Sequence, residues 1–304
     1  MKRSKVSVKK QTAGILGEFG LQLGLYGQLM RINKPVGIWL LLWPTLWGLW
    51  VASNGKPDEW VFTVFVLGVI VMRSAGCVIN DFADRHYDGK VARTSSRPLV
   101  TGAISPSEAL VLFAALALIA VGLVLTLDRY TQMLAIGAAV LTVAYPFCKR
   151  FFVAPQLILG AAFGWSIPMA FAAQSGAVPR IAWLMWIAVL VWAVIYDTMY
   201  AMADREDDRK LGIRSTAILF GQADVFIISV LQFVLLVTLF LSGEVASLGM
   251  WFRLSLLVVA LLMLYQYSLI RTREPKQCFQ AFLNNQYIGA TIFAGTVLSY
   301  TFST

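Results

Sequence analysis

The chain has 304 residues, of which 59% are hydrophobic and 13% charged, and its mean hydropathy is +0.72. Soluble domains carry about 25% charged residues, so this composition excludes an ordinary soluble fold and indicates a membrane protein with several spans. The net charge is +9, but the basic residues flank hydrophobic segments, which is typical of a topology signal and not of nucleic-acid binding. The three cysteines form no CxxC motif and are predicted to be reduced.

The first 30 residues are basic and only mildly apolar. They lack the compact apolar core and the clear cleavage site of a signal peptide. We therefore predict a cytoplasmic N-terminal segment over residues 1–30, with a helix that lies in the membrane interface. Residues 31–304 are predicted to form a single membrane domain.

A helix that spans a bilayer needs about 20 mostly apolar residues. Nine segments meet this requirement: 36–52, 60–79, 108–127, 131–148, 155–174, 181–201, 217–241, 249–270 and 283–302. Pro44 and Pro168 lie inside two of them and are predicted to kink these helices. The sequence therefore predicts an all-α integral membrane fold with nine transmembrane helices.

The distribution of Lys and Arg orients these spans. If the N-terminus is cytoplasmic, the inner segments hold 21 of the 25 basic residues, and the outer segments hold only Lys56, Arg129, Arg180 and Arg253. This asymmetry is a strong positive-inside signal. It predicts a multi-pass protein of the cell inner membrane whose N-terminus is cytoplasmic.

Two acidic clusters, over residues 80–88 and 197–208, hold eight of the 16 acidic residues. Carboxylates beside hydrophobic spans are costly, and both clusters lie at predicted cytoplasmic ends of spans. Two Mg²⁺ sites that bind a diphosphate would explain them, because Mg²⁺ typically takes one or two carboxylates together with substrate phosphates. An acidic loop neutralised by nearby arginines is the simpler alternative.

Helical spacing selects the residues within each cluster. Asn80, Asp84 and Asp88 recur every four residues, so a continuous helix would place them on one face. A second stripe is formed by the following residues of the second cluster: Asp197, Tyr200, Asp204 and Asp208. In both stretches an Asp-x-x-x-Asp pair is followed by Lys, Arg and Ser, which hints at an internal duplication.

Basic residues near the clusters are candidates for binding phosphate or an anionic substrate. Arg73 lies seven residues before Asn80, so it shares a helical face and sits about 10 Å deeper in the span. Lys149 and Arg150 end the fourth span, although simple positive-inside anchoring explains them equally well. The single histidine, His86, is expected to have only a surface role, so we expect neither a histidine-based catalytic triad nor a zinc site.

Several of these stretches resemble the UbiA family of intramembrane prenyltransferases, and within it the subgroup that prenylates 4-hydroxybenzoate for ubiquinone synthesis. The matching stretches are Arg73–Asp88, Arg97–Leu99, Tyr145–Arg150, Tyr196–Asp204 and Gly212–Gly221. The resemblance covers the chain after residue 30. It implies a bundle of nine helices around a central cavity.

The resemblance also implies roles for particular residues. The two acidic motifs would bind diphosphate through the expected cofactor, Mg²⁺, with these ligands: Asn80, Asp84, Asp88, Asp204 and Asp208. Asp84 and Asp204 are thereby also expected to be catalytic. Together with the residues chosen above, the expected substrate-binding set is Arg73, Asn80, Tyr145, Lys149, Arg150 and Tyr200.

The expected reaction is transfer of a polyprenyl group from polyprenyl diphosphate to the ring carbon ortho to the hydroxyl of 4-hydroxybenzoate. Asp197 is a candidate for positioning the acceptor or removing the ring proton, unless it is only a partner of Arg73 or Lys149. The acceptor's carboxylate would be bound by Arg73, Arg31 or Lys34. A different aromatic acceptor and an ion-coupled transporter are the alternatives, although a transporter would place its carboxylates nearer the bilayer midplane. We expect contact with the bilayer, and neither nucleic acid nor an obligate protein partner.

Overall fold

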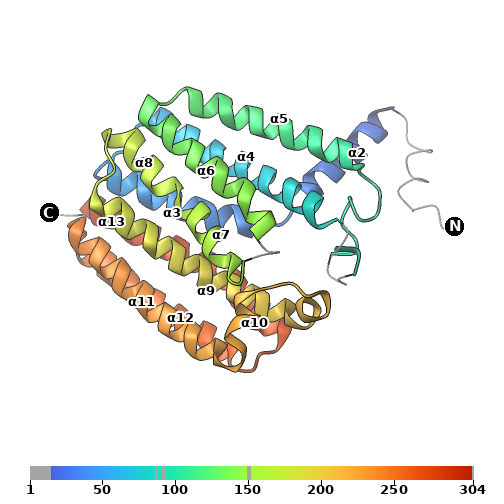
Figure 1. Cartoon of the computed structure of the whole chain (residues 1–304). Coiled ribbons are helices and arrows are strands. Elements are labelled where there is room, and N and C mark those ends of the chain that lie inside the picture. The colour runs from blue at the N-terminus through green and yellow to red at the C-terminus, as the bar shows by residue number, and fades with distance from the viewer. Residues whose placement is uncertain (1–14, 86–87, 91–93, 149–151, 303–304) are drawn as a thin grey trace. The chain divides into compact units, whose positions relative to one another are not determined.

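The computed structural model describes residues 15–85, 88–90, 94–148 and 152–302, and these residues form helices and turns without any strand. The predicted all-α fold is therefore confirmed for this part of the chain (Figure 1). In chain order the elements are α2 (Ile15–Leu29), α3 (Val36–Ala52), α4 (Glu59–Asp84), η1 (Asp88–Lys90), α5 (Pro106–Leu125), α6 (Arg129–Cys148), α7 (Pro155–Gly164), α8 (Ser166–Ser175), α9 (Arg180–Leu211), α10 (Thr216–Phe220), η2 (Gly221–Ala223), α11 (Asp224–Val245), α12 (Met250–Ile270) and α13 (Pro275–Phe302).

Each of the nine predicted spans is largely helical. Six helical stretches of the described residues are long and apolar enough to cross a membrane: Glu59–Arg85, Pro106–Leu125, Pro155–Ser175, Arg180–Leu211, Thr216–Val245 and Met250–Ile270. The other three predicted spans correspond to α3, which is apolar but shorter, and to α6 and α13. The chain is thus a multi-pass membrane protein.

Proline and glycine interrupt two of the spans. The fifth predicted span divides at Trp165 into α7 and α8. Pro168 explains this break, because its ring clashes with the carbonyl of residue 164, four positions earlier, and it lacks an N–H. The seventh divides at Gly221, whose φ of 55° and ψ of −122° leave the helical region. By contrast, α3 runs without a break through Pro44.

The chain divides into two compact units. Residues 1–37 and 68–123 form unit 1, and residues 38–67 and 124–304 form unit 2, so α4 contributes to both. In unit 1, apolar side chains of α2, α4, α5 and the segment before α5 share one core, made of Leu25, Leu29, Val78, Leu99, Ile104 and Ala109. This core joins the end of α2 to the end of α4.

A capping box starts α5. The Ser105 hydroxyl accepts a hydrogen bond from the backbone N–H of Glu108, and the Glu108 carboxylate accepts one from the backbone N–H of Ser105. Pro106 follows at the first helical position, where it needs no hydrogen bond of its own. Glu108 also accepts a hydrogen bond from Gln22 of α2, so the cap ties α5 to α2.

The long helix α9 lies at the centre of unit 2, where it packs against α7, α8, α10, α11 and α13. Small residues allow close approach: a Cβ on Gly160 of α7 would lie 2.8 Å from the carbonyl oxygen of Leu190. Buried amides join the last helices, since Gln232 donates to Gln266 and Gln266 donates to Asn284. Such interhelical hydrogen bonds are worth about 0.6 kcal/mol each in membrane proteins.

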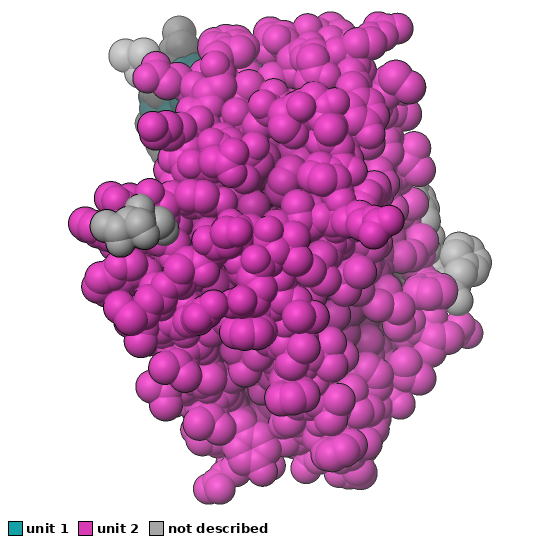
Figure 2. Space-filling view, turned by 90° about the vertical axis from the view of Figure 1, so that its left-hand side faces the viewer, with its two compact units in different colours: residues 1–37, 68–123 teal, residues 38–67, 124–304 magenta. Residues whose placement is uncertain are grey.

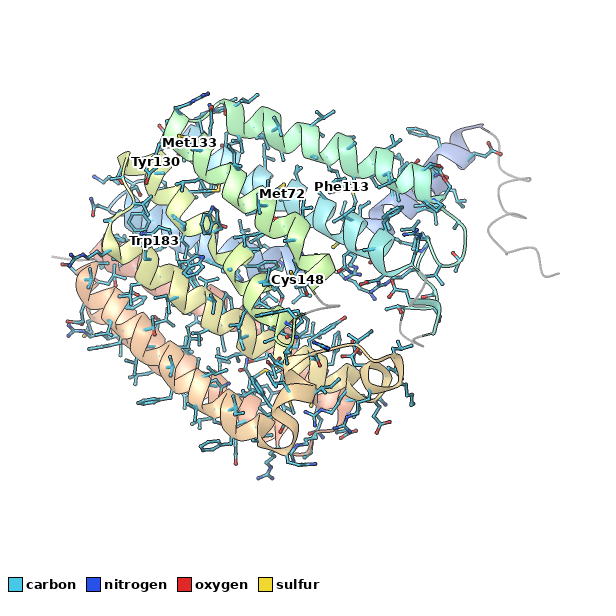
Figure 3. The ribbon with its side chains drawn as sticks, in the orientation of Figure 1. Met72, Phe113, Tyr130, Met133, Cys148 and Trp183 are labelled. Carbon is cyan, nitrogen blue, oxygen red and sulfur yellow. The ribbon has the colours of Figure 1, made fainter. Side chains whose placement is uncertain are left out.

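The outer surface of unit 2 is apolar. Three leucines of α12, Leu257, Leu261 and Leu264, are each more than 60% exposed. Phe226 and Phe233 of α11 are exposed to a similar extent. Figure 2 shows one face of this unit, and Figure 3 places the exposed Tyr130 and Met133 near the start of α6, with Cys148 at its end. Apolar surface on this scale fits contact with lipid.

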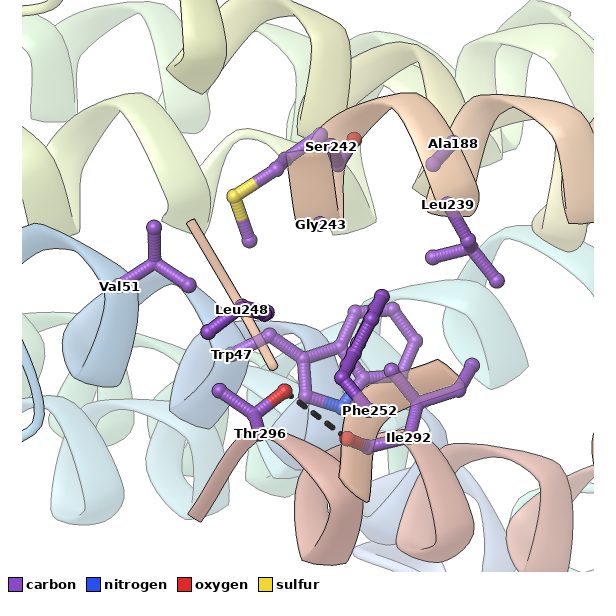
Figure 4. A pocket seen from close by; sticks show the side chains of 11 residues that line it. Trp47, Val51, Ala188, Leu239, Ser242, Gly243, Leu248, Phe252, Ile292 and Thr296 are labelled. Carbon is purple, nitrogen blue, oxygen red and sulfur yellow. Dashed lines mark hydrogen bonds between the residues drawn. The ribbon is translucent and has the colours of Figure 1, made fainter. Parts of the chain in front are cut away.

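A small apolar pocket lies inside unit 2 (Figure 4). Its lining includes Trp47, Phe252 and Ile292, with few polar groups. The two hydroxyls in the lining already donate within their own helices, Ser242 to the carbonyl of residue 238 and Thr296 to that of Ile292. The pocket therefore presents packing surface and no set of reactive groups.

Candidate active site

The first acidic motif lies at the end of α4, in unit 1. Asn80 and Asp84 belong to the last turns of this helix, one turn apart, and both are partly buried. The prediction that Asp88 continues the same helical face is wrong, because α4 ends at Asp84 and Asp88 begins the separate turn η1. The last turn of α4 carries acidic residues and no basic one, so the helix dipole and the repulsion between carboxylates both disfavour its extension.

Asp81 occupies the interior of unit 1 and is bound by two arginines. Its side chain is 3% exposed, and its Oδ1 lies 2.6 Å from Nη2 of Arg31 and 2.9 Å from Nη1 of Arg97. A buried carboxylate needs such partners to offset its desolvation. Asp81 is therefore a structural anchor, which agrees with its omission from the predicted metal ligands.

Asp88, a predicted metal ligand, shares one of these arginines. Its Oδ2 lies 2.5 Å from Nη1 of Arg97. Burial raises the pKa of Asp88, and the neighbouring carboxylates of Asp81 and Asp84 raise it further, against the opposing effect of Arg97. A divalent cation would offset the same repulsion among these carboxylates.

Arg31 reaches Asp81 from an unusual backbone conformation. It follows the end of α2 with a positive φ of 55°, and the N–H of Ile32 bonds back to the carbonyl of Gly27 while the N–H of Arg31 bonds to that of Gln28. This is a Schellman cap, which normally ends with glycine. The ion pair with Asp81 accounts for an arginine at this position.

The second motif lies in unit 2, on the continuous helix α9. This helix runs for 32 residues to Leu211 and ends at Gly212, which adopts the left-handed conformation of a helix cap. The predicted stripe on one helix is therefore confirmed for all four of its members, each of them partly buried: Asp197, Tyr200, Asp204 and Asp208. Of the cluster's remaining acids, Glu206 lies on the opposite face of α9, and Asp207 makes a loose pair with Lys210 at 3.9 Å.

Arg205, next to Asp204, belongs to a second buried ion-pair cluster. Its guanidinium contacts the carboxylate of Asp224, which is fully buried, and Nη2 of Arg273 lies 2.9 Å from the other carboxylate oxygen. Arg273 also has a positive φ, of 57°, and its guanidinium bonds to the backbone carbonyl of Gln222. This cluster fixes the end of α9 to the starts of α11 and α13.

Packing also fixes the middle of the second stripe. The ring of Tyr200 meets that of Phe282 edge to face, with centroids 4.9 Å apart. Two residues before Tyr200, the hydroxyl of Thr198 hydrogen-bonds to that of Thr216 at 2.6 Å, and Gln156 of α7 accepts from the Thr216 backbone N–H. The stretch Gly212–Gly221, which carries part of the family resemblance, is therefore held against α9 at Thr216.

The residues predicted to bind the substrates lie in different surroundings. Arg73 lies on α4 two turns before Asn80, and its Nη1 donates to Sγ of Cys77 at 2.7 Å. Lys34 is exposed, and Tyr145, near the end of α6, is partly buried. Lys149 and Arg150 lie outside the described residues, so their predicted roles stay predictions.

The donor set fits Mg²⁺ chemistry. Both motifs offer carboxylate and amide oxygens, which Mg²⁺ prefers, and it needs only one or two carboxylates when phosphates complete its shell. Among residues 15–85, 88–90, 94–148 and 152–302, no three His, Cys, Asp or Glu side chains gather as a metal site by themselves.

Three residues of the site's surroundings carried no predicted role: Asp224, Arg97 and Arg273. Asp224 carried a signal, as an acidic residue at the start of an apolar span. Its partner Arg273 is 49 positions away in the sequence, and no local sequence pattern predicts an ion pair at that separation.

The sequence pattern of the UbiA prenyltransferase family matches residues 41–290, which is most of the chain. The chain belongs to this family. As a UbiA-family protein it is a prenyltransferase, and its sequence is similar throughout to that of known relatives. It is 57% identical over 275 residues to 4-hydroxybenzoate octaprenyltransferase of Aeromonas hydrophila subsp. hydrophila, covering 90% of this chain and 96% of that protein. Identity to the protein of the same name from Escherichia fergusonii is 54%, over 90% of this chain and 95% of that one.

Solved structures share the UbiA fold. A UbiA homologue from Aeropyrum pernix K1 superposes with a TM-score of 0.75 at 23% identity, covering 85% of this chain and 97% of that one. A UbiA homologue from Archaeoglobus fulgidus, solved with GPP and Mg²⁺, gives a TM-score of 0.68 at 20% identity, covering 91% and 99%. At this identity the likeness establishes the fold.

Proposed function

We propose that this chain transfers a polyprenyl group from polyprenyl diphosphate to 4-hydroxybenzoate, at the ring carbon ortho to the hydroxyl, in ubiquinone biosynthesis. The observation that carries the proposal is the similarity along 90% of the chain to proteins named 4-hydroxybenzoate octaprenyltransferase, at 54–57% identity. Membership of a prenyltransferase family argues against an ion-coupled transporter.

We further propose that the two acidic motifs act on the same diphosphate through Mg²⁺. Asn80, Asp84 and Asp88 would hold the ion from the first motif, and Asp204 and Asp208 from the second. When bound, Mg²⁺ neutralises the negative charge that builds on the departing diphosphate. The mutual repulsion of the carboxylates and the all-oxygen donor set support this assignment.

The bond changes follow from the substrates. The allylic carbon–oxygen bond breaks with its electron pair going to the diphosphate, and a ring carbon of the acceptor supplies the pair for the new carbon–carbon bond. Asp197 is our candidate for receiving the displaced ring proton or for positioning the acceptor. Tyr145, Lys149, Arg150 and Tyr200 are proposed to contact the substrates, and the apolar helices exclude water from the carbocation.

Three residues are candidates for binding the acceptor's carboxylate, and their surroundings differ. Arg31 is engaged with Asp81, and Lys34 is exposed at the end of the first connector. Arg73 lies within a spanning helix and makes no ion pair with any described residue. We therefore favour Arg73.

The membrane arrangement is part of the proposal. Nine spans, a cytoplasmic N-terminus and an active site opening to the cytoplasmic side of the inner membrane account for the distribution of Lys and Arg. Residues 1–30 would form the basic cytoplasmic segment with its interfacial helix, and residues 31–304 the prenyltransferase domain. No obligate protein partner is required.

The test is a product assay in membranes that contain the protein. Polyprenyl diphosphate, Mg²⁺ and one of three acceptors are supplied: 4-hydroxybenzoate, homogentisate or dihydroxynaphthoate. We expect a prenylated product with 4-hydroxybenzoate, and none after chelation of Mg²⁺. Product from another acceptor alone would overturn the acceptor assignment, and no Mg²⁺-dependent product from any of them would overturn the proposed function.

A further inference from the structure

The end of α9 that carries the second acidic motif stays helical beyond its apolar part. The predicted span ends at residue 201, whereas the helix continues to Leu211. Four of the residues in this extension are acidic: Asp204, Glu206, Asp207 and Asp208. Acidic side chains so close together repel one another, and they oppose the helix dipole near a C-terminus. A stabilising contact is therefore needed to keep this end of the helix from fraying.

The strongest candidate for this contact is the ion pair between Arg205 and Asp224. The side chain of Arg205 is 11% exposed and that of Asp224 is fully buried, and attraction between opposite charges is stronger away from water. The two basic residues in the last turn of α9, Arg209 and Lys210, are exposed. Their interaction with the helix dipole is weaker, because solvent and salt screen it.

The carboxylate of Asp224 is held in place independently of α9. Asp224 is the first residue of α11, and its Oδ1 accepts a hydrogen bond from the backbone N–H of Val225 at 2.7 Å. The same oxygen lies 2.9 Å from Nη2 of Arg273, which also donates to the carbonyl of Gln222 at 2.8 Å. Arg205 therefore attaches the end of α9 to a side chain that is already fixed.

The first acidic motif offers a comparison within the same chain. In each motif an arginine directly follows the first Asp of the Asp-x-x-x-Asp pair: Arg85 in the first and Arg205 in the second. Arg85 contacts its own helix, where its Nη1 donates to the carbonyl of Phe82 at 2.6 Å and its Cζ lies 4.3 Å from the centroid of the Phe82 ring. α4 then ends at Asp84, and the second Asp of its pair lies off the helix. α9 continues through both Asp of its pair, so the helix persists in the motif whose arginine binds another helix.

We infer that Arg205 is a positioning residue for the second acidic motif and acts through its ion pair with Asp224. The pair keeps α9 helical through the motif, so that Asp204 and Asp208 stay one turn apart on one face. Arg205 lies about 100° around the helix from Asp204, so the ion pair is beside the acidic face and leaves that face to the ion and the diphosphate. The inference rests on the proposed function, because the site that is positioned is the proposed Mg²⁺ site.

Two methionine variants of the full chain test the inference. Arg205→Met detaches α9 and leaves Asp224 paired with Arg273. Arg273→Met is the matched control, because it also leaves Asp224 with one arginine but keeps α9 attached. Binding of an unreactive prenyl thiodiphosphate is measured as the Mg²⁺ concentration rises, and thermal unfolding reports whether each variant is folded. Arg205→Met should need about tenfold or more Mg²⁺ for half-maximal binding, the size typical of residues that orient metal ligands, and Arg273→Met should stay within about twofold of the wild type.

The direction of the shift separates position from charge. Arg205→Met removes a positive charge beside the carboxylates of the motif, which by itself would favour binding of a cation. Weaker binding of Mg²⁺ in this variant therefore reports lost position. Backbone amide exchange gives a second readout that needs no ligand: residues 202–211 should exchange faster in Arg205→Met than in the wild type, because the end of α9 opens more often.

The outcomes separate the inference from the proposed function. If the wild type shows no Mg²⁺-dependent binding, the proposed diphosphate site fails and the inference fails with it. If the wild type binds but Arg205→Met keeps the wild-type dependence on Mg²⁺, only the inference is wrong. Equal shifts in Arg205→Met and Arg273→Met would show that the cluster merely stabilises the fold, and would also overturn it. If a methionine variant does not fold, Arg205→Lys and Arg273→Lys repeat the comparison, since lysine keeps the charge but not the planar fork of donors; a shift in Arg205→Lys alone supports the inference, and equal behaviour of the two contradicts it.

Discussion

Asp81 and Asp84 lie three residues apart in α4, yet their surroundings assign them different roles. Asp81 is buried and paired with Arg31 and Arg97, whereas Asp84 is partly exposed at the helix end. Removing one member of a buried ion pair leaves the other charges uncompensated. Removing one of several repelling carboxylates costs little by itself.

This contrast gives a prediction for two isosteric variants. Asp81→Asn should lower the free energy of unfolding by about 3–5 kcal/mol, because two arginines lose their charge partner. Asp84→Asn should retain wild-type stability and lower the rate of product formation at least about 100-fold. Unfolding in detergent and product formation are measured for both. Equal stability of the two variants would show that Asp81 is not an anchor.

Asp128 gives a pH-dependent prediction away from the active site. It caps α6, where its carboxylate accepts hydrogen bonds from the backbone N–H and the hydroxyl of Thr131. Burial tends to raise the pKa of Asp128, but the hydrogen bonds from Thr131 and the backbone outweigh this effect and lower it. A lowered pKa means that the stabilisation is present above the ordinary value of about 3.9 and is lost as the pH falls through the folded-state pKa.

Asp128→Asn keeps an N-cap acceptor but loses the negative charge at the helix N-terminus, so it should be less stable than the wild type near neutral pH, by about 0.3–1 kcal/mol. The difference should shrink as the pH falls below about 4, because the wild-type carboxylate is then protonated too. Thermal unfolding in detergent across this pH range measures it. A difference that grows toward acid pH would contradict the sign of the pKa shift.

The residue types at the site were predictable, but their partners were not. Helical spacing alone selected Asp84, Asp204 and Asp208. Spacing says nothing about Asp224, whose two arginines lie 19 and 49 residues away, because such pairs depend on how separate helices pack.

At the scale of the elements, hydropathy predicted the helices and missed where they break or continue. α9 extends to Leu211, ten residues beyond its predicted span, because its charged end is held by ion pairs and hydrophobicity is not required there. The break at Gly221 depends on a backbone conformation, which hydropathy does not encode.

Gly221 gives the prediction at this scale. Its φ of 55° is unfavourable for a residue with a Cβ, although the space around it is empty. Gly221→Ala should therefore lower the free energy of unfolding by about 1–2 kcal/mol through backbone strain alone. Gly68→Ala, in an equally open helical position, should be neutral or slightly stabilising. Equal effects of the two substitutions on thermal unfolding would contradict the assignment of strain.

The two ion-pair clusters have the same arrangement of one aspartate and two arginines. Asp81 in unit 1 and Asp224 in unit 2 are each bound by two arginines, and one arginine of each pair, Arg31 or Arg273, has a left-handed backbone after a helix end. Both clusters adjoin a residue of an acidic motif. This similarity agrees with the internal duplication that the sequence hints at.

At the scale of the whole molecule, the distribution of Lys and Arg predicts which ends of the helices face the cytoplasm. Only four of the 25 basic residues fall in the predicted outer connectors. The apolar outer faces of α11 and α12 fit a lipid environment. Sequence alone predicted the apolar helices well, because the bilayer imposes a strong and simple constraint on composition, whereas their orientation stays a prediction.

Cysteine labelling tests the orientation. Cys77 and Cys278 are buried, so replacing the partly exposed Cys148 with serine removes the accessible native thiol. In that background, Lys56→Cys should react with an impermeant thiol reagent from the outside only, and Glu206→Cys from the cytoplasmic side only, since both positions are exposed. Labelling of both from the same side would contradict the nine-span topology.

The central proposal is that each acidic motif binds, through Mg²⁺, the diphosphate of a prenyl donor. Its most direct test is binding of an unreactive prenyl thiodiphosphate as a function of Mg²⁺ concentration. We predict that Asp84→Asn and Asp204→Asn each weaken binding at least tenfold and flatten its dependence on Mg²⁺, while Glu206→Gln, exposed on the same helix as Asp204, binds as the wild type does. Wild-type, Mg²⁺-dependent affinity in either of the first two variants would contradict the account.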